Sequence, residues 1–149
     1  MKKTCIILIM MAGIFTAVES HAQIRKIPAE VTETLRDKYP MATDLEWRDK
    51  IRGFTASFEL DGQKHLANFN NEGIWESTET TIEEETLPSV VKDSYAKSKY
   101  AEWEVGLVQK IEMPEEKIQY RVQAIRSEIR KKNLYFNSEG RMLKDRMTL

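Results

Sequence analysis

An internal repeat constrains the fold of this chain more than any other feature of its sequence. An apolar residue, a proline and, three positions later, a valine begin one copy at 27–31 and the other at 87–91. Each copy then passes a Lys-Tyr pair and a tryptophan and ends in Phe-Asn-x-Glu-Gly, at 69–73 and at 136–140. The copies are offset by 60 residues at the prolines and by 67 at the glycines. Several matches in the same order indicate a duplicated folding unit.

Each copy is predicted to begin with an amphipathic helix. Apolar residues recur every four positions, a spacing that places them on one helical face. They are Ile27, Val31, Leu35 and Tyr39 in the first copy, and Leu87, Val91 and Tyr95 in the second. Proline is tolerated at a helix start because its missing N–H has no partner there, and Pro40 ends the first helix. Helices are expected over 28–39 and 88–99.

After each helix, apolar and polar residues alternate, which is the period of a strand with one buried face. The core-facing sets are Phe54, Ala56, Phe58 and Leu60, and Ile118, Tyr120, Val122 and Ala124. Asp61-Gly62 predicts a tight hairpin. The glycines that end 70–73 and 137–140 suit turns that need a positive φ. These signals predict strands over 54–60 and 118–124, each followed by a turn.

The fold class is therefore α+β, with two tandem units that each consist of a helix and an antiparallel meander of three or four strands. The units are assigned to 23–82 and 83–149, which together make one compact domain. The Glu- and Thr-rich segment 76–86 is expected to connect them. The carboxylates of Glu83 to Glu85 are expected to cap the positive end of the second helix and to stay in solvent.

The first 22 residues have the layout of a secretory signal peptide. A positively charged start precedes an apolar run over 6–18, and Ser20-His21-Ala22 places small residues before a cut after Ala22. The run has 13 residues, fewer than the roughly 20 of a membrane-spanning helix. A retained anchor helix is the alternative, which the charge of Glu19 disfavours. We expect a mature chain of 127 residues that is periplasmic or secreted.

The mature chain lacks the groups for several kinds of chemistry. Its single cysteine, Cys5, falls within the leader, so thiolate metal sites and cysteine nucleophiles are excluded from the mature part. Without the leader the chain has 21 basic and 23 acidic residues, a balance that argues against nucleic acid as a partner. The glycines are scattered and form no phosphate-binding loop, so no cofactor is predicted.

One weak candidate for catalysis is His65, the only histidine of the mature chain. A general base needs a nucleophile or an orienting carboxylate close by, and no motif in the sequence supplies either. The turn at 70–73 offers oxygen ligands but lacks the alternating Asp and Asn residues of calcium loops. We therefore predict no catalytic residue, no metal site and no enzyme activity.

The repeated elements resemble those of the PepSY-like exported bacterial proteins. The shared features are two copies of Pro-x-x-Val, an aromatic residue near each helix end, a tryptophan segment and Phe-Asn-x-x-Gly, which together cover nearly the whole mature chain. The architecture of this family is similar to that of beta-lactamase inhibitor proteins. The resemblance implies two helix-plus-four-strand units in one curved sheet, with helices on one face and the other face open. Related proteins use such surfaces to inhibit peptidases or beta-lactamases.

The open face is the expected place for a partner. Because Trp, Tyr and Arg carry most of the energy of protein interfaces, the candidate partner-binding residues are Trp75, Tyr135 and Arg121. Arg121 occupies an outward position of its strand, and Trp75 and Tyr135 each lie near a phenylalanine expected in the core. The alternative places Trp75 and Tyr135 at the edge of the core. Trp47 and Trp103 are expected in the core.

A basic cluster lies in the longer hairpin of the second copy. Its members are Arg126, Arg130, Lys131 and Lys132. One interpretation is a contact for an acidic partner or a lipid headgroup. The other is a solvated loop tip, interrupted by Glu128.

Three functions are compatible with the sequence. The leading hypothesis is a non-catalytic protein-binding module of the cell envelope, in one form an inhibitor of an exported enzyme, whose partner is an envelope or secreted protein. The second is a carrier of a small apolar or amphipathic ligand held between sheet and helices, which a closed aromatic pocket would favour. The third is an enzyme that uses His65 with a carboxylate bonded to it inside a pocket.

Overall fold

The computed structural model describes residues 25–148, which form two α-helices, one short 3-10 helix and eight strands. In chain order these are α1 (Ala29–Lys38), β1 (Thr43–Lys50), β2 (Gly53–Leu60), β3 (Gln63–Asn70), β4 (Trp75–Thr81), η1 (Glu84–Thr86), α2 (Ser89–Ala96), β5 (Glu104–Met113), β6 (Lys117–Ser127), β7 (Arg130–Asn137) and β8 (Met142–Met147). The predicted signal peptide and its cleavage site lie outside the described residues. None of the helices in the described part is long and apolar enough to cross a membrane.

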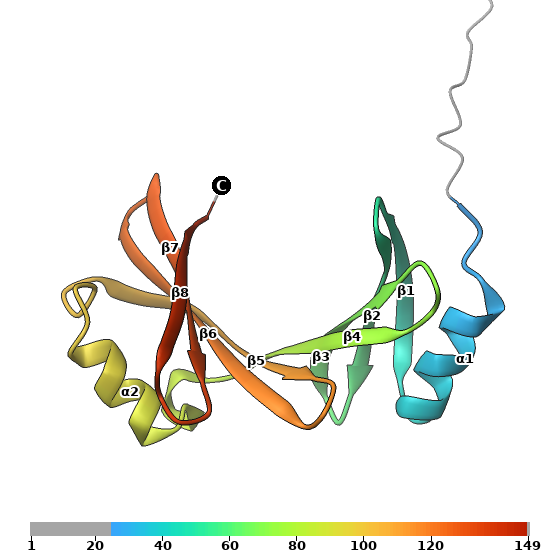
Figure 1. Ribbon diagram of the computed structural model, residues 1–149, viewed down its shortest axis with the longest axis horizontal. Coiled ribbons are helices and arrows are strands. Elements are labelled where there is room, and N and C mark those ends of the chain that lie inside the picture. The colour runs from blue at the N-terminus through green and yellow to red at the C-terminus, as the bar shows by residue number, and fades with distance from the viewer. Residues whose placement is uncertain (1–24, 149) are drawn as a thin grey trace, which may run out of the picture.

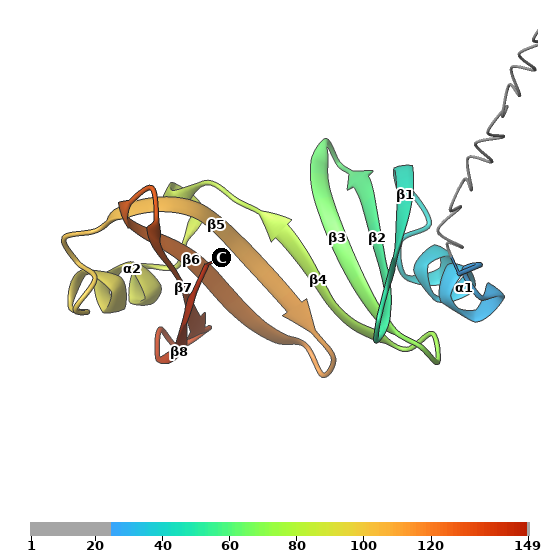
Figure 2. The same ribbon diagram turned by 90° about the horizontal axis from the view of Figure 1, so that it is seen from above.

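All eight strands belong to one antiparallel sheet. They follow one another in chain order from β1 to β8, so that β1 and β8 form its edges. Figure 1 shows the sheet curving, with α1 and α2 on its convex side, and Figure 2 shows from above that the two helices lie at opposite ends. The α+β class and the single curved sheet are as predicted. We call the side that carries the helices the helix face and the other side the open face.

The first core lies between α1 and strands β2 and β3. Val31 is fully buried and Leu35 is 3 % exposed, as their helical spacing predicted. Their partners are Phe54, Ala56, Phe58, Ala67 and Phe69. Burial of an apolar side chain of this size stabilises a protein by about 1.5–3 kcal/mol. Because alternate residues of a strand point to opposite sides, the intervening polar residues of β2 lie on the open face, as expected.

The second core repeats this arrangement under α2. Val91 is fully buried, and its partners include Val108, Val122, Ala124, Leu134 and Phe136. Trp47 packs against the first core and Trp103 against the second, as expected for both. Each core thus consists of one helix and the helix face of the strands that follow it.

The asparagine of each Phe-Asn-x-Glu-Gly segment organises a turn. After β3, Asn70 Oδ1 accepts hydrogen bonds from the backbone N–H groups of Glu72 and Ile74, both at 2.9 Å. After β7, Asn137 Oδ1 accepts one from the N–H of Arg141 at 2.8 Å. Side-chain bonds of this kind stabilise turns without help from neighbouring elements.

The glycine of each turn lies directly against the start of a helix. A Cβ atom at Gly73 would stand 3.1 Å from the Cβ of Glu30, and one at Gly140 only 2.4 Å from the carbonyl oxygen of Val90. Both glycines also have a positive φ, +82° and +84° respectively, which residues with a Cβ adopt at a cost. The motif therefore fixes the turn and lets the helix approach it.

Segment 76–86 differs from its prediction as a connection. Residues 75–81 form β4, a strand that pairs with both β3 and β5. Its Thr78 and Thr80 are 1 % and 7 % exposed, and their hydroxyl groups are hydrogen-bonded to side chains of the first half. Threonine is β-branched and suits a strand, but a Thr-rich strand does not show apolar alternation.

The second helix is shorter than predicted, because α2 ends at Ala96. The chain then turns, with the N–H of Ala101 bonded to the carbonyl of Ser98 and that of Trp103 to the carbonyl of Tyr100. These turns bring Tyr100, which is 3 % exposed, into the second core.

Tyr100 also connects this turn to the edge strand β8. Its hydroxyl donates a hydrogen bond to the carboxylate of Asp145, which lies 3.3 Å from the ammonium groups of both Lys99 and Lys132. The hydrogen bond from Tyr100, followed by the two lysines, lowers the pKa of Asp145 from 3.8 to about 2, although partial burial opposes this shift.

We expect Asp145→Asn to lower the free energy of unfolding at pH 7. Since the folded pKa lies below the unfolded value, the contribution of Asp145 is present above about pH 4 and is lost as the pH falls towards about 2. Urea unfolding should therefore show a flatter pH dependence for the variant between these values. Asp93→Asn, at an exposed position of α2, serves as control. Parallel pH profiles for Asp145→Asn and the parent protein would contradict this prediction.

We expect Gly140→Ala to destabilise the protein more than Gly62→Ala. Both positions have a positive φ, so each substitution costs about 1 kcal/mol for that reason alone. Only Gly140 has the helix backbone against it, whereas no atom lies within 4 Å of a Cβ at Gly62. The excess measured for Gly140→Ala by thermal unfolding should be about 1–3 kcal/mol. Equal losses would show that the close approach of α2 contributes nothing.

Candidate binding site on the open face

The open face carries rows of side chains that run across the strands, because paired residues of neighbouring antiparallel strands point to the same side. One row is formed by Thr55, Asn68 and Ser77, and a second by Gln109, Arg121, Tyr135 and Lys144. The second row contains two of the three candidate residues that the sequence predicted.

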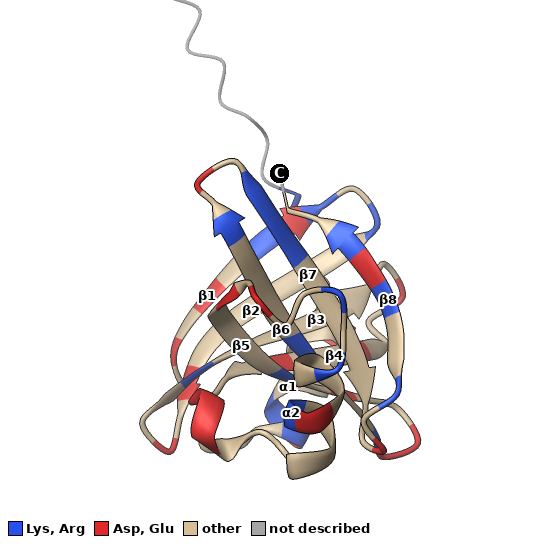
Figure 3. Cartoon of the chain, turned by 90° about the vertical axis from the view of Figure 1, so that its left-hand side faces the viewer, with Lys and Arg blue, Asp and Glu red and all other residues tan. Residues whose placement is uncertain are grey.

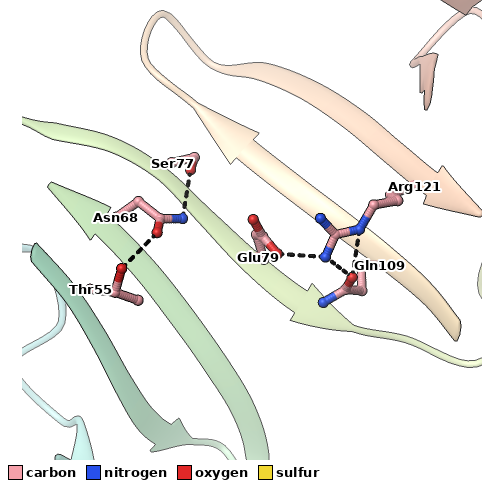
Figure 4. Close-up of polar contacts among 6 residues, drawn as sticks. All are labelled: Thr55, Asn68, Ser77, Glu79, Gln109 and Arg121. Carbon is pink, nitrogen blue, oxygen red and sulfur yellow. Dashed lines mark hydrogen bonds and ion pairs between the residues drawn. The ribbon is translucent and has the colours of Figure 1, made fainter. Parts of the chain in front are cut away.

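The first row is a chain of hydrogen bonds. Thr55 Oγ1 donates to Asn68 Oδ1 and Asn68 Nδ2 donates to Ser77 Oγ, each at 3.1 Å (Figure 4). Thr55 is only 2 % exposed although it belongs to the open face. These side chains are thus already ordered, which reduces the entropy that a binding partner would remove.

Arg121 links the two halves of the sheet. Its Nη2 donates to Glu79 Oε2 and its Nε to Gln109 Oε1, both at 2.7 Å (Figure 4). Glu79 belongs to β4 and Arg121 to β6, so the ion pair spans β5 between them. The side chains of Arg121 and Glu79 are 21 % and 17 % exposed, so solvent and salt screen this pair less than a pair on the open surface.

Tyr135 lies beside Arg121. The two are direct cross-strand partners on β7 and β6. The ammonium group of Lys144 lies 4.4 Å from the centre of the Tyr135 ring, a cation–π arrangement. A partly exposed aromatic ring between two cations combines residue types that are common at interface hot spots.

Trp75 does not join them, so its expected place on the open face is wrong. It pairs with Phe69 and packs at the edge of the first core, on the helix face. The cause is the turn after β3: the register of the β3–β4 pair shifts between Asn68 and Phe69, which sets Trp75 opposite Phe69. Cross-strand partners share a face, so Trp75 takes the core side.

The open face is basic at its β7–β8 end, which the overall charge of the chain conceals. Residues 117–149 contain nine Lys and Arg but only three Asp and Glu. Lys131, Lys144 and Arg146 lie on the open face, and none of them forms an ion pair with any residue from 25 to 148. Figure 3 shows these strands with blue Lys and Arg segments. We call these three residues the basic end; counting charge by strand would have predicted it.

The basic cluster predicted from the sequence is divided between the two faces. Lys132 meets Asp145 on the helix face, and the guanidinium of Arg126 lies 6.0 Å from the centre of the Trp103 ring. Arg130 is exposed at the hairpin tip. Only Lys131 of the four belongs to the open face.

His65 contacts a hydroxyl group and an aromatic ring. Its Nδ1 is hydrogen-bonded to Thr80 Oγ1 at 2.8 Å, and its ring stacks on Phe58 with centroids 5.4 Å apart. The enzyme hypothesis required a carboxylate hydrogen-bonded to His65 inside a pocket, and among residues 25–148 the ring is hydrogen-bonded only to Thr80. Within residues 25–148, no three His, Cys, Asp or Glu side chains are placed to hold a metal ion.

We expect Arg121→Met to lower the free energy of unfolding by about 1–3 kcal/mol, because Glu79 then remains half-buried without its partner. A double-mutant cycle with Glu79→Gln in urea should give a coupling of about 1 kcal/mol. The control cycle uses Lys117 and Glu115, whose paired side chains are 65 % and 74 % exposed, and it should give a coupling near zero. A coupling no larger for Arg121 and Glu79 than for the control would contradict a link across β5.

Residues 52–144 match a protein family described as "Putative beta-lactamase-inhibitor-like, PepSY-like". No protein with a curated description matches the sequence.

Three solved structures from Bacteroides species resemble the fold. A BLIP-like protein from Bacteroides fragilis has a TM-score of 0.72 at 26 % identity, over 83 % of this chain and 87 % of that one. A DUF2874 family protein from Bacteroides uniformis has a TM-score of 0.76 at 22 % identity, over 82 % and 90 %. A structure from Bacteroides eggerthii described as "putative periplasmic proteins" has a TM-score of 0.74 at 21 % identity, over 82 % and 89 %.

Proposed function

This chain belongs to the PepSY-like, beta-lactamase-inhibitor-like family, and on that basis we propose that it is a non-catalytic protein-binding module of the bacterial cell envelope. It binds its partner through the open face. The observation that carries the proposal is the adjacency of Tyr135 and Arg121 on β7 and β6, with Lys144 against the ring of Tyr135.

The order of the open face supports protein binding. The hydrogen-bonded row from Thr55 to Ser77 and the Arg121–Glu79 pair hold polar groups in fixed positions. Interfaces with preordered polar groups lose less conformational entropy on association. Tyr135 is then the aromatic anchor of the proposed interface, and the ordered polar groups make further contacts with the partner.

The packing between sheet and helices disfavours the carrier hypothesis. Val31, Val91, Leu134 and Phe136 are fully buried there, and Phe58 is 2 % exposed. Side chains that touch so closely fill the space in which a carried ligand would have to lie. A binding site on the open face needs no such space.

The basic end indicates what kind of partner fits. Lys131, Lys144 and Arg146 bring positive charge to the open face without internal counter-charges among the described residues. An acidic protein surface would be attracted and oriented by them. One solved relative is described as BLIP-like, so the form of the function that we propose is inhibition of an exported enzyme with an acidic surface.

The organisation of the chain follows the same proposal. The two halves, 23–82 and 83–149, are tandem copies, which accounts for the glycine turns packed against both helices at Gly73 and Gly140. Residues 1–22 direct the protein out of the cytoplasm. A relative from Bacteroides eggerthii is described as "putative periplasmic proteins", which favours the periplasm for this chain.

The test starts from residues 23–149 as a tagged bait in envelope and secreted extract of the source bacterium. The affinity of the captured protein, once purified, is measured by biolayer interferometry, and its enzymatic activity is assayed with and without the module. We expect Tyr135→Ala to weaken binding by about 30-fold, since truncation of a hot spot costs about 2 kcal/mol. Arg36→Ala, at an exposed position of α1 on the helix face, should leave the affinity unchanged.

Three outcomes would contradict the proposal in whole or in part. A partner that binds Tyr135→Ala as tightly as the parent protein uses another surface. If no protein is captured from the extract at micromolar bait, the proposal that the chain is a protein-binding module is wrong. If the partner binds but its enzymatic activity does not change, the protein-binding proposal stands and the inhibition proposal is wrong.

A further inference from the structure

A hollow of about 410 Å³ lies on the helix face between the end of α1 and the hairpin that joins β5 and β6. Its walls include Trp75 and Lys38 from the first half and Glu112, Glu115, Glu116 and Lys117 from the second. It lies on the side of the sheet opposite the open face, and the proposed function does not use it. It therefore raises a separate question about the role of Trp75.

The indole ring of Trp75 is held in a fixed position. Its Nε1–H donates to Thr78 Oγ1 at 2.8 Å, and the same oxygen lies 2.6 Å from the hydroxyl of Tyr39. Thr78 is 1 % exposed, and Trp75 also packs against the first core. The ring is therefore preordered, which favours binding on the face that does not pack against the core.

A cation already occupies the face of this ring. The Nζ atom of Lys38 lies 3.7 Å from the centre of the Trp75 ring, closer than any other cation to a ring in residues 25–148. Trp is the aromatic residue that attracts cations most strongly. Lys38 is an exposed side chain without an ion pair among those residues. Its ammonium group contacts the Trp75 ring and, more distantly at 5.7 Å from the ring centre, Tyr39.

Three glutamates line the same hollow. Glu112 pairs with Lys110, and Glu115 pairs with Lys117. Glu116 also lines the hollow and forms no ion pair with a residue in 25–148. If Lys38 moves away, three carboxylates and one lysine, Lys117, remain in the lining of the hollow. An aromatic face under an excess of carboxylates is a suitable environment for a positively charged group.

We propose that this hollow binds an organic cation, a primary ammonium or guanidinium group, which takes the place of the Lys38 ammonium on the ring of Trp75. The remaining N–H groups of the bound cation are directed to the carboxylates of Glu112 and Glu116. Lys38 is the internal competitor: it fills the site in the free protein and leaves when a ligand enters. The source of the cation is either a free polyamine or a Lys or Arg side chain of a polypeptide.

The test follows the indole N–H resonances of the three tryptophans by NMR in the mature protein. The probes are N-acetyl-lysine methylamide, spermidine and the uncharged N,N′-diacetyl-lysine methylamide. We expect both amines to shift the Trp75 resonance saturably while Trp47 and Trp103 stay in place. Lys38→Ala should bind each amine about three- to fivefold more tightly than the parent protein, the factor that corresponds to an exposed cation–π contact.

Two further variants separate the site from a general charge effect. Arg36→Ala removes the same charge from α1 outside the hollow, and it should leave the affinity unchanged. Glu116→Gln, in the Lys38→Ala background, should weaken both amines. Tighter binding of spermidine than of the lysine amide assigns the site to free polyamines, and the reverse order assigns it to a polypeptide side chain.

The proposal is overturned if no amine shifts Trp75 saturably, or if the uncharged diacetyl compound shifts it as strongly. It is also overturned if Arg36→Ala gains affinity as much as Lys38→Ala does. None of these measurements depends on the open face, so a negative result leaves the proposed function untouched, and failure to capture a protein partner leaves this site untouched.

Discussion

The pairing of β4 with β5 is the contact on which the rest of the structure depends. It consists of four residue pairs, Thr78 to Thr81 with Glu112 to Gln109, and it is extended by the hydrogen bond from the N–H of Ile82 to the carbonyl of Val108. Through this pairing two four-stranded meanders become one eight-stranded sheet. The Arg121–Glu79 pair, which crosses β5, and the hollow beside Trp75, which needs walls from both halves, exist only because the strands meet there.

Curvature then separates the two faces into different environments. Antiparallel sheets twist, and bulges bend them further; register shifts occur in five of the seven strand pairs. On the convex side the side chains diverge, and a helix at each end fills the space. On the concave side they converge, which buries Thr55 and Gln109 to 2 % and 9 % exposure in a sheet face that no helix covers. Polar groups crowded in this way have to bond to one another, and the rows of Figure 4 show that they do.

The sequence predicts most of what depends on local period. The buried positions of both helices, the alternation of β2 and β6 and the glycine turns all follow from spacing, and the structure has them. The strand β4 could not be found in this way, because its buried positions are Thr78 and Thr80, whose hydroxyl groups find partners only in the folded protein. The face of Trp75 could not be found either, since a turn and a register shift between Asn68 and Phe69 decide it. The apolar period of one strand ends at the turn, so it cannot tell which face of the sheet the residues of the next strand occupy.

The distribution of charge between the faces explains why the open face should have a preference among partners. Asp145 is the only acid on β8, and strand alternation places it on the helix face. There it accepts a hydrogen bond from Tyr100 and forms ion pairs with Lys99 and Lys132. Lys144 and Arg146, its neighbours on either side, point to the open face and form no ion pair with Asp145. Such unpaired surface cations stay hydrated and cost little stability, but they repel a basic surface and attract an acidic one over about 10 Å at physiological salt. Their effect should therefore be larger on the rate of association than on the lifetime of a complex, whereas Tyr135, which has to be desolvated to act, should determine the lifetime.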